Sequence, residues 1–167
     1  HYWMHNNMLT INGQKMGKSL GNFITLNQFF TGDHPALKKA FGPMTIRFFI
    51  LSAHYRGTVD FSNEALEGSE RGLERLLNGI SDLAWVKAEE KTDDETARFI
   101  QALPQKCYDA MNDDMATPQV ISHLFEACTV VNKLTDYKAS ATQQDIDTLA
   151  NTMRTFAFDI LGLRDDH

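Results

Sequence analysis

The spacing of apolar residues divides the chain into two parts. From Ser62 onward, apolar residues recur every three or four positions, which is the period of an amphipathic helix with one buried face. Four such stripes follow one another, and each predicts one long helix. The first stripe comprises Leu66, Leu73, Leu76, Leu77, Ile80, Leu83 and Ala84. The second part of the chain is therefore predicted to be an α-helical bundle of about four helices.

Capping residues mark the ends of the other three helices. Thr92-Asp93-Asp94-Glu95 is a capping-box pattern, Thr117-Pro118 combines an N-cap with a first-turn proline, and Thr142 opens the last helix. Gly162 suits a C-terminal stop, and Pro104 is expected to kink or split its helix. The residues expected to face inward are Phe99, Leu103, Cys107, Ala110 and Met111, then Ile121, Leu124, Phe125, Cys128 and Val131, then Ile146, Leu149, Met153, Phe156, Ala157 and Ile160.

Before Ser62 the apolar pattern is short and irregular. Residues 8–11 and 14–16 flank Asn12-Gly13, the pair favoured in a two-residue type I′ turn, so they predict a β-hairpin. Thr25 and Gln28 form a capping box at the start of a first short helix over residues 26–31. Two more short helices are expected over residues 35–42 and 44–53, the second with Ile46, Phe49 and Ile50 in its apolar stripe and Phe48 packing on its other side against the hairpin. The chain is thus predicted to be mainly α, with a short N-terminal hairpin and a small helical module before the bundle.

The hairpin leads into a loop with the residue types that bind phosphate. Lys15 and Lys18 are three positions apart, so their ammonium groups could converge on one polyphosphate. Gly17 and Gly21 let the backbone approach a ligand closely and adopt a positive φ. Ser19 adds a hydroxyl that could bond to phosphate or cap the loop. On spacing alone, a lysine-rich surface hairpin with no ligand remains the alternative.

Three separated stretches resemble one family. They are Tyr2-Trp3-Met4-His5-Asn6 with Gly13-Gln14-Lys15-Met16-Gly17-Lys18-Ser19-Leu20-Gly21-Asn22, then Leu51-Ser52-Ala53-His54-Tyr55-Arg56 with Phe61-Ser62, and Ala110-Met111-Asn112-Asp113-Asp114-Met115-Ala116-Thr117-Pro118. Together they are similar to cysteinyl-tRNA synthetases, which are class I aminoacyl-tRNA synthetases, and the lysine loop resembles their KMSKS signature. Gly17 stands where the commoner motif has Ser, but both lysines are retained.

The resemblance implies a function for a longer parent enzyme. Such an enzyme activates cysteine with ATP and Mg²⁺ to cysteinyl-adenylate and transfers the cysteine to tRNA(Cys). Lys15 and Lys18 would then be catalytic, Lys18 and Ser19 would bind the ATP phosphates, and Arg56 would either contact tRNA phosphate or tie its helix to the bundle. Residues 1–57 would form the lysine loop and a stem-contact module, and residues 58–167 a DALR-type anticodon-binding bundle.

The same resemblance implies that parts of the enzyme lie outside this chain. The Rossmann domain and the zinc ligands of the family would precede residue 1, and an anticodon-reading segment would follow residue 167. This segment alone is therefore not expected to be active.

Charge and composition agree with this assignment. Residues 1–56 carry six basic residues against Asp33 alone, whereas the remaining 111 residues hold ten basic and 21 acidic ones. Such asymmetry indicates that only the first part faces polyanions. No apolar run approaches the roughly 20 residues that span a bilayer, and we expect a cytoplasmic monomer. Cys107 and Cys128 lie on apolar helical faces and are expected to be buried, reduced thiols.

Other polar and aromatic residues carry less functional weight. His1 and His5 are expected to be structural, Asp113 and Asp114 to order their loop, and Trp85 to pack. Two alternative functions remain open at this stage. One is a non-enzymatic helical module that binds tRNA or protein, and the other is a related ligase that joins cysteine to a small amine.

Overall fold

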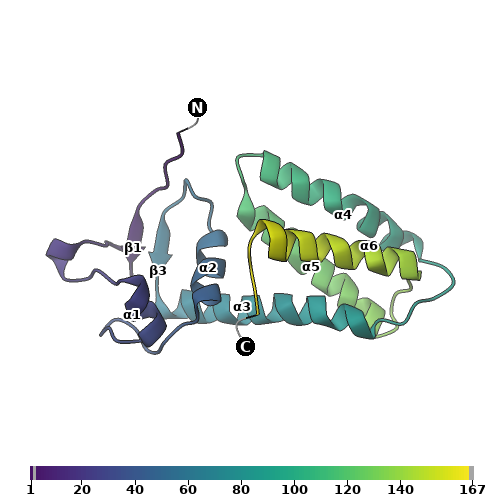
Figure 1. Cartoon of the computed structure of the whole chain (residues 1–167), viewed down its shortest axis with the longest axis horizontal. Helices are drawn as coiled ribbons and strands as arrows, with labels where there is room; N and C mark the ends of the chain where they lie inside the picture. Colours follow the sequence, from purple (N-terminus) through teal and green to yellow (C-terminus); the bar gives the residue numbers. More distant parts are fainter. Residues whose placement is uncertain (2, 166–167) are drawn as a thin grey trace. The chain divides into compact units, whose positions relative to one another are not determined.

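The computed structural model describes His1 and residues 3–165, so Tyr2 of the first motif lies outside the described residues. The chain divides into two compact units, formed mainly by His1–Leu73 and by Glu74–Leu163, and the division falls within helix α3 (Asn63–Asp82). The structure is mainly helical with one small sheet, as predicted. Figure 1 shows both units along the chain.

The sheet lies in the first unit and contains the predicted hairpin. Strands β1 (Leu9–Ile11) and β2 (Gln14–Lys15) pair antiparallel, and β3 (Val59–Phe61) pairs parallel to β1 on its other side. Asn12 and Gly13 have φ values of 50° and 76°, the positive angles that a type I′ turn requires at both central positions. The Asn-Gly signal therefore predicted the turn correctly.

Two short helices cover this unit. Helix α1 (Leu26–Thr31) has the predicted capping box, in which the Gln28 N–H donates to Thr25 Oγ1 and the Thr25 N–H donates to Gln28 Oε1. Helix α2 (Pro43–Leu51) begins with its proline. The core joins these helices to the sheet, because the Phe61 ring lies 4.9 Å from Phe29 and 4.8 Å from Phe49 between centroids.

Two predictions for this unit were wrong. Residues 35–42 form turns and bends in place of a helix, because the Lys38 N–H and the Ala36 carbonyl both bond to the amide side chain of Asn63, each at 2.8 Å. That partner is distant in sequence, so local pattern could not reveal it. In α2, Ile50 is 44% exposed although it was expected in the buried stripe, whereas Phe48 is 3% exposed.

The second unit is the predicted helical bundle. It contains the end of α3 with a 3₁₀ turn η2 (Leu83–Trp85), then α4 (Asp94–Asn112), α5 (Thr117–Thr135) and α6 (Gln143–Arg154), which continues as a π-helical turn η3 (Thr155–Ile160). Helices α4, α5 and α6 lie side by side (Figure 1). The fully buried residues include Leu76, Leu103, Leu124, Leu149 and Met153, one or more from each helix.

Several details of the bundle differ from the prediction. Asp93, not Thr92, caps α4 and accepts from the Thr96 N–H at 2.9 Å, because the Thr92 hydroxyl is engaged by the Thr142 N–H. Pro104 does not split α4. Trp85 is 79% exposed because α3 gives way to the η2 turn. Further positions expected inside are exposed or half-buried: Ala84, Leu77, Phe99, Met111, Phe125 and Ile160.

Both cysteines are buried and free, as predicted. Burial raises the pKa of each thiol to about 11, so both are protonated at neutral pH. Cys128 lies against Gly79 of α3, where an added Cβ would lie only 2.6 Å from its Sγ. This close approach is a packing contact between α3 and α5.

Candidate phosphate-binding loop

The loop that carries both lysines leaves the β1–β2 hairpin. Strand β2 ends at Lys15, and a single 3₁₀ turn, η1 (Lys18–Leu20), begins three residues later. Gly21 closes this turn in the left-handed region at φ 68°, and its N–H donates to the Lys18 carbonyl at 3.2 Å. Gly17 has extended backbone at φ −162°, so of the two glycines only Gly21 uses the positive φ that glycine allows.

The side chain of Asn22 closes the loop across its base. Its Oδ1 accepts from the Gly17 N–H at 3.0 Å, and its Nδ2 donates to the Lys15 carbonyl at 3.0 Å. One amide therefore fixes the backbone beside both lysines. This contact could not be predicted from the local sequence pattern, because it depends on the return of the chain through η1.

The charges of the loop are available to a ligand. Lys15, Lys18 and Ser19 are exposed, and within the described part of the chain neither lysine forms an ion pair. The Lys18 ammonium lies 5.5 Å from the centroid of the Phe23 ring, a cation–π distance that leaves its N–H groups open.

Two other lysines of the same unit are neutralised instead. Lys38 pairs with Glu64 at 2.8 Å and Lys39 with Glu70 at 2.5 Å. The hydrogen bond between the first pair raises the pKa of Lys38 and lowers that of Glu64. Of the four lysines in this unit, Lys15 and Lys18 are the two for which the described residues provide no carboxylate partner.

Asp60 anchors the tip of the hairpin from strand β3. Its Oδ1 accepts from Thr10 Oγ1 at 2.5 Å and from the Gly13 N–H at 2.8 Å. The bond from Thr10, and then that from Gly13, lower the pKa of Asp60 below its usual 3.8. Sequence reasoning missed Asp60, because its register opposite Thr10 follows only from the parallel pairing of β1 and β3. The turn and the loop base are thus held by two different side chains.

Comparison with known proteins assigns this loop to a family. The family model described as the tRNA synthetases class I (C) catalytic domain matches residues 1–71, and the DALR domain model matches residues 106–164. Cysteine–tRNA ligase of Porphyromonas gingivalis is 58% identical over 165 residues, and that of Parabacteroides distasonis is 55% identical over 166 residues. The chain belongs to the cysteinyl-tRNA synthetase family. Each alignment covers 99% of this chain and 33% of the relative.

The chain therefore spans about a third of the length of these cysteinyl-tRNA synthetases. A similar fold occurs in a solved ternary complex of Agrobacterium radiobacter K84 LeuRS with tRNA and LeuAMS. The TM-score is 0.60 at 20% sequence identity, with 94% of this chain and 20% of that chain covered. At this identity the likeness concerns the fold alone.

The second synthetase landmark forms the connector between α2 and β3. The Asn7 N–H donates to the Tyr55 carbonyl at 3.0 Å, and Asn7 Nδ2 donates to the Arg56 carbonyl at 2.8 Å. The Arg56 guanidinium lies 5.2 Å from the centroid of the Tyr55 ring. These bonds order the landmark next to the sheet, and a tRNA contact by Arg56 stays a prediction.

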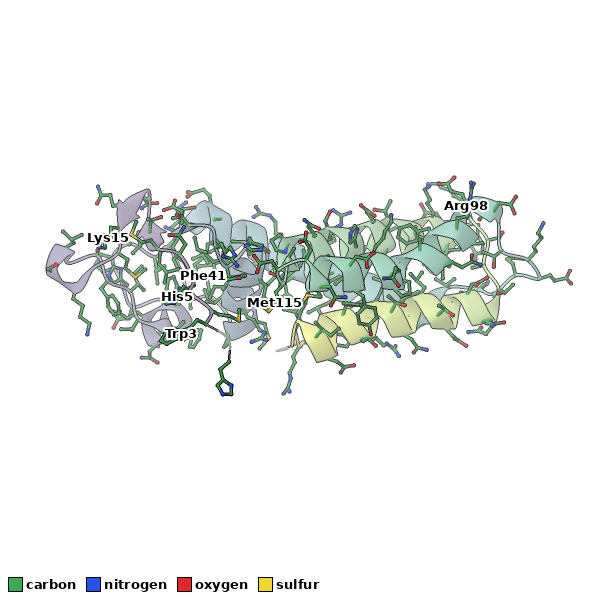
Figure 2. All side chains as sticks on the ribbon, turned by 90° about the horizontal axis from the view of Figure 1, so that it is seen from above. Trp3, His5, Lys15, Phe41, Arg98 and Met115 are labelled. Atoms are coloured by element: carbon green, nitrogen blue, oxygen red, sulfur yellow. The ribbon has the colours of Figure 1, made fainter. Side chains whose placement is uncertain are left out.

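The other polar residues considered from the sequence include His5, Asp113 and Asp114, and the structure gives each of them a local structural contact or a place in a turn. His5 stacks on Trp3 with centroids 5.6 Å apart (Figure 2). Asp113 and Asp114 lie in the turn between α4 and α5, where Asp114 and Met115 have positive φ. Among the described residues, no cluster of His, Cys, Asp and Glu could hold a metal ion. No helix in the described part of the chain is long and apolar enough to cross a membrane.

Proposed function

We propose that the chain is the part of a cysteine–tRNA ligase that supplies the lysine loop for ATP and a helical domain for tRNA. The parent enzyme activates cysteine with ATP to cysteinyl-adenylate and then transfers the cysteine to tRNA(Cys). The observation that carries this proposal is the pair of exposed lysines without acidic partners on a loop fixed at its base. Lys38 and Lys39 of the same unit do not meet this description, because each already holds a carboxylate.

The loop's role follows from where negative charge develops. When the cysteine carboxylate attacks the α-phosphate of ATP, charge builds on non-bridging oxygens and on the departing pyrophosphate. Cations held at those positions stabilise the transition state more than the ground state and so raise the rate. Lys18 is proposed as the first contact with the ATP phosphates, Lys15 as the second, and Ser19 as a hydrogen-bond donor to phosphate.

Metal ions are assigned outside these residues. By analogy with the family, Mg²⁺ is proposed to arrive bound to ATP and Zn²⁺ to be held elsewhere in the parent enzyme. Residues 1–57 are proposed to form the catalytic loop and the stem-contact module, and residues 58–167 to contact tRNA. Arg56, next to that boundary, is proposed as a phosphate contact. We propose that the parent acts in the cytoplasm as a monomer.

Amino-acid-dependent ATP–pyrophosphate exchange by the full-length protein tests this function. We expect exchange with cysteine and none with methionine, valine or serine. Lys18→Ala should lower the exchange rate by roughly 10²- to 10³-fold, the effect of removing one donor to a developing charge. Lys38→Ala removes the same charge from an ion-paired position of the same unit and should change the rate less than about threefold.

Three outcomes would count against the proposal. Absence of exchange with every amino acid would reject the activity, and an unchanged rate in Lys18→Ala would remove Lys18 from the mechanism. Cysteine-dependent exchange without transfer to tRNA, together with ligation to a small amine, would favour the related ligase.

A further inference from the structure

Several backbone polar groups of the loop from Lys15 to Gly21 are bonded within the chain. The Met16 N–H donates to the Leu9 carbonyl at 3.2 Å, and the Leu20 N–H donates to the Gly17 carbonyl at 3.1 Å. The Gly21 N–H donates to the carbonyl of Lys18 at 3.2 Å. Two further groups, the Lys15 carbonyl and the Gly17 N–H, both bond to the Asn22 side chain. These bonds come from the chain itself, so they favour one backbone conformation of the loop.

Asn22 joins segments that the strands cannot hold. Pairing of β1 with β2 ends at Lys15, and nothing in the sheet positions Gly17 or Lys18. The Asn22 amide takes over at that point, because it carries a donor and an acceptor in one group and can bond to both a carbonyl and an N–H. A carboxylate lacks the donor, and an alanine lacks both. The distance between the two lysine backbones thus depends on this one amide.

The position of Asn22 also links the lysines to rigid structure. Gly21 immediately before it closes η1, and Phe23 immediately after it lies beneath the Lys18 ammonium. Two residues further on, Thr25 caps helix α1. Asn22 is therefore tied to the helix on one side and to both lysines on the other.

We propose that Asn22 is a positioning residue, which holds Lys15 and Lys18 in a preorganised arrangement for the charge that develops on the ATP phosphates. If the loop is already ordered, no entropy is lost in ordering it at the transition state. The effect of Asn22 should therefore appear in the rate of the chemical step. The proposal rests on the function proposed above, and it assigns to Asn22 a role that requires no contact with the substrate.

The test compares Asn22→Ala with Asn27→Ala in the full-length protein. Asn27 is exposed on α1, and no side-chain hydrogen bond involves it within the described residues, so it is a matched control. Cysteine-dependent ATP–pyrophosphate exchange should show kcat reduced about tenfold in Asn22→Ala, with the KM for ATP within about twofold of wild type. Asn27→Ala should match wild type in both constants.

A second variant separates the amide's chemistry from its size. Asn22→Asp has nearly the same shape and keeps an acceptor for the Gly17 N–H, but it sets a carboxylate oxygen against the Lys15 carbonyl. We expect a loss at least as large as that of Asn22→Ala. If Asn22→Asp had wild-type kcat, the two-way bond would be irrelevant and the proposal would be wrong.

A combined mutant shows whether Asn22 acts through the two lysines. On a background with both Lys15→Ala and Lys18→Ala, adding Asn22→Ala should lower kcat by less than about threefold, because the groups that it positions are gone. A full additional tenfold loss would overturn the proposal. A purely structural role would give that additive result and would also lower the thermal midpoint, which we expect to stay within about 2 °C of wild type.

Hydrogen exchange provides a readout that does not depend on activity. In the full-length protein without ATP, the peptide that contains Gly17 should exchange more slowly in wild type than in Asn22→Ala, and equally in wild type and Asn27→Ala. Rapid exchange in wild type would exclude a preorganised loop. If wild type shows this protection but no amino acid supports ATP–pyrophosphate exchange, the proposed function fails while the structural role of Asn22 stands.

Discussion

The loops of His1–Leu73 are held by polar side chains that bond to the backbone, whereas the helices of Glu74–Leu163 are held by a continuous apolar core. In the first unit three asparagine amides each use both their donor and their acceptor on backbone groups: Asn7, Asn22 and Asn63. In the second unit, the fully buried residues are mostly leucines and other apolar side chains. Bonding of this kind can fix irregular backbone, which an apolar stripe on a helix cannot do.

The charges differ in the same way. Residues 1–73 carry seven basic and five acidic side chains, and residues 74–163 carry eight basic and fifteen acidic ones. The two lysines without carboxylate partners that the lysine loop exposes belong to the first unit. The exposed cations of the lysine loop thus stand on irregular backbone, whereas the second unit is a regular helical scaffold.

The largest difference in the free energy of unfolding is expected between alanine substitutions at two glycines of helix α3, one in each unit. Gly79 lies against Cys128, and an added Cβ would be 2.6 Å from its Sγ, whereas an added Cβ at Gly68 would meet nothing within 4 Å. Gly79→Ala should therefore lower the free energy of unfolding by about 1–3 kcal/mol through overpacking. Gly68→Ala should raise it by roughly 0.5–1 kcal/mol through helix propensity. Urea unfolding followed by circular dichroism measures both.

The Gly79 result can be traced to its contact. Adding Cys128→Ala to Gly79→Ala removes the Sγ atom and should make the two substitutions non-additive, because they share one contact. Shifts in the same direction for Gly68→Ala and Gly79→Ala would contradict the contrast between an open and a closely packed part of α3.

The regular helices of the second unit could be predicted from the sequence more completely than the irregular backbone of the first unit. The helices of the bundle were predictable because a buried helical face imposes a period on the sequence, and Thr142 marks one start correctly. Residues 35–42 were not, since their backbone bonds to Asn63. Trp85 was wrongly expected to pack, because the pattern does not show where α3 changes to a 3₁₀ turn.

The candidate site was predictable only in its charged residues. Lys15 and Lys18 could be selected from their spacing and from the resemblance to a family. Asn22, which bonds at the base of the loop, and Asp60, which bonds at the hairpin turn, could not be predicted, because each becomes a partner only after the chain has turned back. Side chains that support a site through the backbone leave no periodic signal in the sequence.

A smaller effect is expected when the carboxylate at the hairpin tip is removed or protonated. Asp60→Ala loses the bonds from Thr10 and Gly13 and should cost about 0.5–1.5 kcal/mol, the range of one net hydrogen bond, because the site is largely exposed. Asp60→Asn keeps an acceptor and should cost less. Unfolding of the two variants in urea gives both values, and equal losses would show that the carboxyl oxygen is not the group that matters.

The pH dependence of this contact follows from the direction of its pKa shift. The pKa of Asp60 is lowered in the folded chain, so its contribution to stability is present above the unfolded pKa and is lost as the pH falls through the folded value. The NMR shift of the Gly13 amide should therefore titrate below pH 3.8 and stay constant near neutrality. In the second unit, hydrogen bonds from the Ser140 amide and then from the Thr96 amide lower the pKa of Asp93. The NMR shifts of these two amides should therefore also change only at acidic pH.

The smallest effect is expected for Gly17→Ser, which introduces the residue of the commoner family motif. The backbone at Gly17 is extended, and an added Cβ would lie 3.7 Å from Leu20 Cδ1, an ordinary van der Waals distance. The Gly17 N–H would remain bonded to Asn22, so both lysines should keep their positions. We expect kcat of pyrophosphate exchange in the full-length protein to change less than about threefold and the free energy of unfolding by less than about 0.5 kcal/mol. Gly21→Ser, at φ 68°, is the matched control and should be more harmful, because only the Gly21 position requires left-handed backbone. If Gly17→Ser were the more harmful of the two, the loop would adopt another conformation during catalysis.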